Sequence, residues 1–528
     1  MTSTRKHTYE NTEQRGESVS LLPYLSEVQN TSKKYSVIFR GLNYGEGTQD
    51  GEFAETHNLS TDQYPCITQR AKRVKSGQYS SPTTIHAKGS LLIIDGTKVF
   101  YGDKEVGTVT EGKKQTATIG NYIVIFPDKK YYKVPTENDK DGTFGDMEVE
   151  FKATNLKFTA STIEAETDFP FNKGDSVKIS GCSNNGNNKE PIIRGVSGKV
   201  LTFDDNTFTA GTESGEVTIK REVPPLDFVC ESNYRLWGTH GNTIYSSAYS
   251  DPLNFKSFDG IANDSYYIDV GSEGAFTGCI PFSSHICFFK ENTLHKLYGT
   301  KPSNFQLTTA NVYGIQSGSE RSVQIVNEQL LYKGVGGVYA YTGGVPELIS
   351  EKFGNNLYSD AVACCDGEKY YISMKQGGKW SLFTYDVIKN IWLREDETQA
   401  VDMAFYNGKV YYVDSNGGLY YIDKAADRND IEWGATFCTI HETMNERKGY
   451  SKFHLRMDLS AGAWLAVDIK TDNDLQWQQV YTTHNEKAKT VSIPIMPTRC
   501  DSIDIRLRGK GKCTIKAFIR EFTVGSDV

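Results

Sequence analysis

The sequence predicts an all-β protein: a β-propeller of about six or seven blades, a small β-domain inserted into it, and a C-terminal β-sandwich. Three observations predict this fold class. A tyrosine-rich hairpin pattern repeats, the repeat is interrupted once, and the last hundred or so residues alternate apolar and polar residues. Composition agrees, because 48 glycines and 31 tyrosines in 528 residues suit turn-rich sheets.

The amino-terminal region, residues 1–34, is polar and mixed in charge except for the apolar run 19–25, VSLLPYL. Such a composition cannot bury a core by itself, so we expect an arm that becomes ordered only against a partner. Strand-like sequence begins at Tyr35, and we assign 35–145 to the first part of the propeller. Two hairpins, 91–101 and 122–132, carry the repeat there.

The repeat is clearest in 225–425, the predicted second part of the propeller. Each unit is an apolar run, a turn of Gly, Asn or Asp, and a second run with tyrosines. The spacing is 49, 45, 39 and 40 residues, close to the ~40–50 residues of a propeller blade. The units open near Asp227, Phe276, Arg321, Asp360 and Ala400.

Two further domains interrupt and follow the repeat. Residues 146–224 contain the alternating strands 176–180, 199–203 and 216–220, which predict a small inserted β-domain. Residues 426–528 alternate over 453–459, 464–469, 502–507 and 514–519. That pattern buries one face of a sheet and solvates the other, as in a β-sandwich.

Charge and composition exclude several classes of function. A net charge of -8 opposes coating of duplex DNA, which needs a basic surface, but suits a channel past which DNA slides. We expect no membrane segment and no secretory signal, because no apolar run is long enough. The ten cysteines contain no C-x-x-C pair, the nine histidines no metal motif, and the chain no G-x-S-x-G. No cofactor and no catalytic residue is predicted.

One loop resembles a calcium-binding loop. It places Glu137, Asp139, Asp141 and Glu148 at loop positions 1, 3, 5 and 12, with Gly142 at position 6. The flanking sequences predict strands, whereas such loops join helices, and position 1 is Glu where Asp is usual. We therefore interpret the segment as a connector into the inserted domain, with calcium as the alternative.

A short basic cluster follows the first strand region: Arg70, Lys72, Arg73 and Lys75. A solvated face is one interpretation. The more specific interpretation is a patch that faces another subunit or DNA.

Several stretches carry a resemblance in a fixed order, among them FRGLN at 39–43, RLWG at 235–238, NTIYSS at 242–247, DPLNF at 251–255, FKEN at 289–292, YGTKPSNF at 298–305 and GVYAY at 337–341. Over about 35–425 the sequence resembles bacteriophage tail proteins of the nozzle, or tail tubular protein B, type, together with propeller proteins of prophages. The chain is shorter than those nozzle proteins, so the resemblance leaves its position in the tail open.

The resemblance implies a structural virion protein of the phage tail, assembled in the bacterial cytoplasm. Its expected partners are other tail or head-tail connector proteins and further copies of itself, in a hexameric ring for nozzle relatives. Genomic DNA would pass through without sequence-specific binding. One alternative is a receptor- or carbohydrate-binding tail-tip protein that uses Trp433, Trp464 or Trp477, for which a core position is the competing interpretation. Another is a propeller hydrolase whose paired carboxylates the sequence does not single out.

Overall fold

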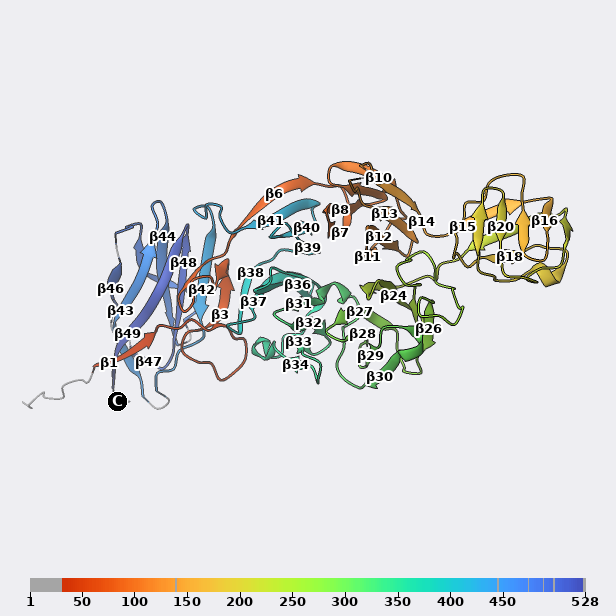
Figure 1. The fold of residues 1–528 in the computed structure, drawn as a ribbon. Coiled ribbons are helices and arrows are strands. Elements are labelled where there is room, and N and C mark those ends of the chain that lie inside the picture. Colours follow the sequence, from red (N-terminus) through yellow and green to blue (C-terminus); the bar gives the residue numbers. More distant parts are fainter. Residues whose placement is uncertain are drawn as a thin grey trace, which may run out of the picture.

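The computed structural model describes residues 31–137, 140–443, 446–472, 474–487, 489–496 and 499–525. Sandwich, propeller and inserted domain follow one another from left to right in Figure 1. Among the described residues the only helical elements are the short 3-10 turns η1 (Asn185–Asn187), η2 (Pro302–Asn304), η3 (Glu320–Ser322) and η4 (Glu351–Phe353).

Seven four-stranded antiparallel sheets make up the propeller within the described ranges, which confirms the predicted fold. Blades 1 and 2 are β7 (Pro82–Lys88), β8 (Ser90–Asp95), β9 (Lys98–Tyr101), β10 (Lys104–Thr108), and β11 (Gln115–Ile119), β12 (Tyr122–Phe126), β13 (Lys130–Lys133), β14 (Thr143–Asp146). Blades 3 and 4 are β23 (Phe228–Ser232), β24 (Arg235–His240), β25 (Thr243–Ser246), β26 (Tyr266–Asp269), and β27 (Phe276–Phe282), β28 (His285–Lys290), β29 (Leu294–Tyr298), β30 (Gln306–Ala310). Blades 5 and 6 are β31 (Gln324–Val326), β32 (Gln329–Gly334), β33 (Gly337–Tyr341), β34 (Glu347–Leu348), and β35 (Ser359–Cys365), β36 (Lys369–Gln376), β37 (Lys379–Asp386), β38 (Ile391–Asp396). Blade 7 is β39 (Ala400–Tyr406), β40 (Lys409–Asp414), β41 (Gly418–Asp423) and β6 (Lys72–Gln78).

The central strands read as continuous apolar runs because both faces of each blade are buried. In β28, Phe288 packs toward blade 3 with Trp237, whereas the next residue, Phe289, packs toward blade 5 with Tyr332. Each of the seven blade boundaries has its own apolar cluster of this kind, including the boundary between blades 7 and 1. The ring is therefore closed by packing all the way round.

Blade 7 also closes the ring through the chain itself. Its outer strand β6 comes from the amino-terminal side and pairs antiparallel with β41. The segment 35–69, which the sequence predicted to be propeller, lies instead in the sandwich, where Phe39, Phe53 and Ile67 join the sandwich core. Short extended segments carry the same alternation in either domain, so the pattern alone did not distinguish them.

The sandwich has a seven-stranded and a six-stranded sheet. Its amino-terminal strand β1 pairs with the last strand, so residues 31–34 of the predicted arm form a strand, and residues 1–30 lie outside the described part. The first sheet contains β1 (Thr31–Ser36), β4 (Leu59–Ser60), β5 (Ile67–Gln69), β43 (Lys448–Leu459), β46 (Thr490–Pro494), β47 (Arg499–Cys500) and β49 (Cys513–Val524). The second contains β2 (Gly41–Leu42), β3 (Glu52–His57), β42 (Glu432–Phe437), β44 (Trp464–Thr471), β45 (Gln478–Thr483) and β48 (Ile503–Lys510).

The inserted domain lies between blades 2 and 3 and has its own core, which includes Phe158, Ile163, Leu201 and Ile219. One sheet runs β15 (Val149–Ala153), β22 (Val217–Arg221), β18 (Lys178–Ser180). The other runs β19 (Gly195–Ser197), β20 (Val200–Thr202), β17 (Thr162–Glu164), β16 (Leu156–Phe158), β21 (Gly211–Glu213). A separate core explains why the propeller repeat resumes unchanged after it.

Candidate functional site

The centre of the propeller is bridged by one arginine. Arg321 lies in η3, just before blade 5, and its guanidinium donates to the carbonyl oxygens of Thr83 (2.7 Å) and Lys114 (2.9 Å). It also lies 3.2 Å from Asp402 Oδ2. Thr83 lies in blade 1, Lys114 directly before blade 2 and Asp402 in blade 7. The largely buried guanidinium therefore links blade 5 to three blades that are not its neighbours in the ring.

The partner of this arginine is itself buried. Asp402 accepts a hydrogen bond from the backbone N–H of Ile85 (2.9 Å), so it ties β39 to β7 at the point where the ring closes. Burial raises the pKa of the Asp402 carboxyl more than Arg321 lowers it. Nothing in the local sequence around Arg321 predicted this contact, because its partners are distant along the chain.

The predicted basic patch is not a basic surface. Arg73 is buried, with its guanidinium 2.6 Å from Glu395 Oε2 and 2.5 Å from Asp396 Oδ2 of β38. Arg70 is also largely buried, and its Nε donates to Asn58 Oδ1 (2.6 Å). Lys72 pairs with Asp430 at 2.9 Å, and of the four only Lys75 is exposed. The prediction of a subunit- or DNA-facing patch is therefore wrong, because carboxylates of blade 6 neutralise the two arginines.

These charges stabilise one another. Burial alone would lower the pKa of the Arg73 guanidinium, but Asp396, Tyr412 and Glu395 outweigh it and the pKa is raised. Burial would likewise raise the pKa of Asp396, yet Arg73 holds it below its usual range. The cluster joins β6 of blade 7 to β38 of blade 6, so its role is to fix these two neighbouring blades together.

The predicted calcium loop is only partly described, since Asp139 lies outside the described residues. Glu148 is already bonded: Lys129 Nζ lies 2.7 Å from its Oε1, and Lys220 Nζ 3.4 Å from its Oε2. Asp141 is almost fully exposed, 3.9 Å from Lys104. The interpretation of the segment as a connector into the inserted domain is wrong, because it joins β13 to β14 as a hairpin connection within blade 2. Within the described ranges no group of three or more His, Cys, Asp or Glu side chains is placed to hold a metal ion.

The three tryptophans of the glycan-binding alternative divide between core and surface. Trp433 is buried and donates to the carbonyl of Gly511 (3.2 Å), as the core interpretation predicted. Trp464 and Trp477 are half-buried on the six-stranded sheet. Arg508 lies over the first, 5.7 Å from the ring centroid, and Arg506 over the second at 4.5 Å. A guanidinium group thus already lies over one face of each of these two indoles.

Blade 3 carries an exposed aromatic surface that the sequence analysis missed. Buried Arg235 organises it, because its guanidinium donates to the carbonyls of Ser247 (2.9 Å), Asp264 (2.5 Å) and Ala262 (2.7 Å) and so holds the loop 247–265 in place. Five large side chains remain exposed there: Tyr234 (63%), Tyr249 (43%), Phe258 (52%), Ile261 (56%) and Tyr267 (57%). We call these five the blade-3 surface. Local sequence did not reveal it, because tyrosine is common in every blade.

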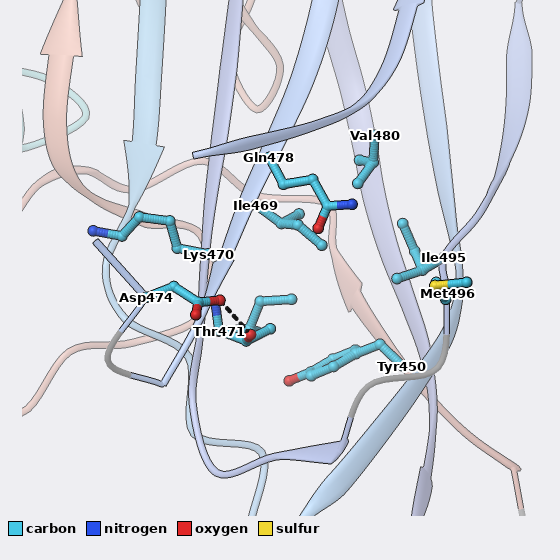
Figure 2. A pocket seen from close by; sticks show the side chains of 10 residues that line it. Tyr450, Ile469, Lys470, Thr471, Asp474, Gln478, Val480, Ile495 and Met496 are labelled. Atoms are coloured by element: carbon cyan, nitrogen blue, oxygen red, sulfur yellow. Dashed lines mark hydrogen bonds between the residues drawn. The ribbon is translucent and has the colours of Figure 1, made fainter. Parts of the chain in front are cut away.

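A small cavity opens at one end of the sandwich, between its two sheets (Figure 2). It measures about 70 Å³. Tyr450 of β43 and Ile495 line it from one sheet, and Ile469, Val480 and Ile503 from the other. Thr471 Oγ1 donates to Asp474 Oδ2 (2.8 Å) at its edge.

The cysteine thiols show the effect of burial. All ten cysteines are free, and burial raises the pKa of several, for example Cys287 to about 12. Within the described part of the chain, no helix has the length and apolar character that crossing a membrane requires.

Fold and site together define a seven-bladed β-propeller protein with two attached β-domains. No protein-family model matches the sequence, and no curated protein matches it. Solved structures similar to the chain include BamB from Moraxella catarrhalis, 10% identical, covering 68% of this chain and 98% of that chain with a TM-score of 0.34. Kluyveromyces lactis Hsv2 is 11% identical over 50% of this chain and 88% of that chain, with a TM-score of 0.28. The N-terminal domain of Nup159 is 11% identical over 51% of this chain and 96% of that chain, with a TM-score of 0.20. These distant likenesses carry no functional argument.

Proposed function

We propose that this chain is a structural protein of a bacteriophage tail, a nozzle-like or tail-channel ring component of the virion. It assembles in the host cytoplasm with further copies of itself and with other tail or head-tail connector proteins. The proposal rests on the ordered sequence resemblance to nozzle-type tail proteins and on one structural observation, the blade-3 surface. No catalytic step is part of it.

The blade-3 surface supports assembly because monomeric proteins rarely expose contiguous apolar side chains over a large area. Its four aromatic members form two pairs: the rings of Tyr234 and Tyr249 are 5.7 Å apart, as are those of Phe258 and Tyr267. Aromatic side chains are also the residues that protein interfaces favour. We therefore propose that another tail subunit covers this surface in the virion.

The contacts of Arg321 bear on how DNA would pass. Because Arg321 links blade 5 to blades 1, 2 and 7, we propose that DNA does not thread a single propeller. In the proposed ring of subunits, the passage lies between copies of the chain, and the acidic net charge limits adhesion of DNA to its wall.

The test is to image the purified protein and an intact virion by electron microscopy, and to measure assembly mass by mass photometry. We expect a ring and matching density in the tail. The double variant Phe258→Ser, Tyr267→Ser should abolish assembly, whereas Ile388→Ser, which removes an exposed apolar side chain from blade 6, should not. Absence of the protein from virions would refute the proposal.

A second candidate function is glycan recognition at a tail tip. It is favoured by a groove of about 580 Å³ between blades 6 and 7, where half-exposed Trp380 lies beside polar groups of Gln399, Asp414 and Asn416. An aromatic face among polar groups is typical of ligand grooves. A glycan array that gives binding lost in Trp380→Ala, by a protein that forms no ring, would favour this function over the first.

A further inference from the structure

The sandwich cavity lies at an unpaired edge of both sheets. β45 is the outermost strand of the six-stranded sheet, and β46 with the residues after it borders the other sheet. Val480 of β45 and Ile495 after β46 line the cavity, and in Figure 2 they lie on the same side of it. The gap between the sheets is therefore open to an extended segment that approaches along this edge.

One buried polar group lines the cavity without a partner. Tyr450 is 2% exposed, and no described atom forms a hydrogen bond with its hydroxyl. A buried hydroxyl without a partner is unfavourable, so an acceptor is expected to meet it. Burial also raises the pKa of Tyr450, so the hydroxyl remains a donor at neutral pH.

Met496, which is 83% exposed, lies at the mouth of the cavity, and Leu475, 95% exposed, follows the lining residue Asp474 in the chain. The inner walls include the aliphatic side chains of Ile469, Val480 and Ile495, and polar residues such as Gln478 and Thr471 also line the cavity. The space is several times what one ordered water occupies. A branched aliphatic side chain that brings a backbone carbonyl with it matches both the walls and the Tyr450 hydroxyl.

The amino-terminal part of the chain offers such a segment within reach. The run 19–25, VSLLPYL, precedes the described residues and contains three leucines. β1 begins at Thr31 opposite Thr523, and Tyr450 lies opposite the adjacent Phe522, so the chain enters the sandwich at the cavity's end. From β1 across β49 and β43 to the edge is three strand spacings, about 14 Å. The nine residue steps from Leu22 to Thr31 span up to about 30 Å.

We propose that residues 19–25 of the same chain bind along this edge of the sandwich, with a leucine side chain in the cavity and a backbone carbonyl accepting from the Tyr450 hydroxyl. The amino-terminal region would thereby complete the sandwich core. This inference is independent of the proposed tail function, since it concerns one chain and requires no assembly.

The test is photo-crosslinking in the full-length protein. Leu22→benzoylphenylalanine should crosslink, within one chain, to peptides containing Val480 or Ile495. The same group at Thr12, in the polar part of the amino-terminal region, should give no such crosslink. A mixture of 14N- and 15N-labelled chains separates crosslinks within a chain from crosslinks between copies.

A pair of surface variants controls for specificity. Met496→Glu places a charge at the mouth on an exposed side chain, and should lower the crosslink yield at least about tenfold, equivalent to about 1.4 kcal/mol. Leu357→Glu, at an exposed leucine between η4 and β35, should leave it unchanged. Crosslinks elsewhere, crosslinks only between copies, or none at all would each overturn the proposal.

Discussion

The propeller is joined to its two neighbouring domains in different ways. On the sandwich side, buried Lys369 of β36 pairs with Asp62 and donates to Ser60 Oγ of β4 (2.9 Å). The Thr56 hydroxyl of β3 also bonds the backbone N–H and carbonyl of Arg394 in β38. On the side of the inserted domain, Arg194 and Asp259 pair at 2.6 Å while about a third and a quarter exposed. The cation of the first junction is buried, whereas the ion pair of the second is partly exposed to solvent. The second junction also has one hydrogen bond from a buried residue, from Asn254 Nδ2 to the Gly174 carbonyl (2.6 Å).

This difference indicates which junction fixes the position of a domain relative to the propeller. A buried ion pair contributes little net stability when intact, but loss of one partner leaves an unpaired buried charge, so only one arrangement is tolerated. An exposed pair is screened by water and salt and constrains little. We therefore expect propeller and sandwich to behave as one rigid body, and the inserted domain to be energetically separate.

Removal of Arg73 should have the largest effect. Arg73→Met leaves Glu395 and Asp396 without their closest cation, and should lower the free energy of unfolding by about 3–5 kcal/mol. Denaturant titration at neutral pH measures this. Lys72→Met is the matched control, because Lys72 lies on the same strand but has an exposed partner. It should lower the free energy of unfolding by less than about 1 kcal/mol. Equal losses would contradict the contrast between buried and exposed pairs.

The backbone of the sandwich junction offers the next test. Gly41 has φ +80°, and a Cβ there would lie 2.5 Å from the Trp392 carbonyl oxygen of β38. Gly41→Ala should therefore lower the free energy of unfolding by about 1–3 kcal/mol, in addition to the loss caused by the positive φ at this position. Gly47→Ala isolates that backbone cost, because Gly47 has φ +78° and a Cβ added there would meet no atom within 4 Å. The two variants should differ in thermal unfolding midpoint; similar midpoints would indicate a loose junction.

A pH titration tests a buried contact between two blades of the propeller. His86 of blade 1 lies 2.7 Å from Thr118 Oγ1 and 3.0 Å from Thr116 Oγ1 of blade 2, and burial lowers its pKa to about 4. Since the unfolded value is about 6.5, its contribution is complete above that pH and is lost as pH falls toward 4. Stability should decline by up to about 1.4 kcal/mol per pH unit over this window. His86→Gln should flatten the decline measured by urea unfolding; an unchanged slope would assign it to other groups.

The smallest effect should come from the solvent-exposed junction. Arg194→Met removes the contacts to Asp204 and Asp259, and should change the unfolding free energy of the propeller by less than about 1 kcal/mol. Raising salt to about 1 M should mimic the substitution in the native protein. A loss comparable to that in Arg73→Met would show that this exposed pair constrains the protein as firmly as a buried one.

Much of the fold was predictable because blade hairpins are local in sequence. The predicted unit openings at Phe276 and Ala400 coincide with the first residues of β27 and β39, and Asp227, Arg321 and Asp360 lie within three residues of the starts of β23, β31 and β35. The inserted domain was predictable for the same reason, since it has its own alternating strands. The domain assignment failed for residues 35–69, because short strands there pair with partners hundreds of residues away, such as β3 with β42.

The site features were less predictable. The basic cluster was visible as charge, but its meaning depended on Glu395 and Asp396. Arg321 and Tyr450 gave no sequence pattern, because their significance comes from what lies opposite them. The blade-3 surface required knowledge of which tyrosines remain outside the core.

Local sequence patterns were enough to predict the all-β class, the blade repeat and two additional domains, because period-two alternation and turn residues act over a few neighbouring positions. The three-dimensional structure was needed to establish how the ring closes, that the amino-terminal strands complete the sandwich, and that the basic cluster is buried. These outcomes depend on contacts between residues far apart in the chain, which local patterns do not encode.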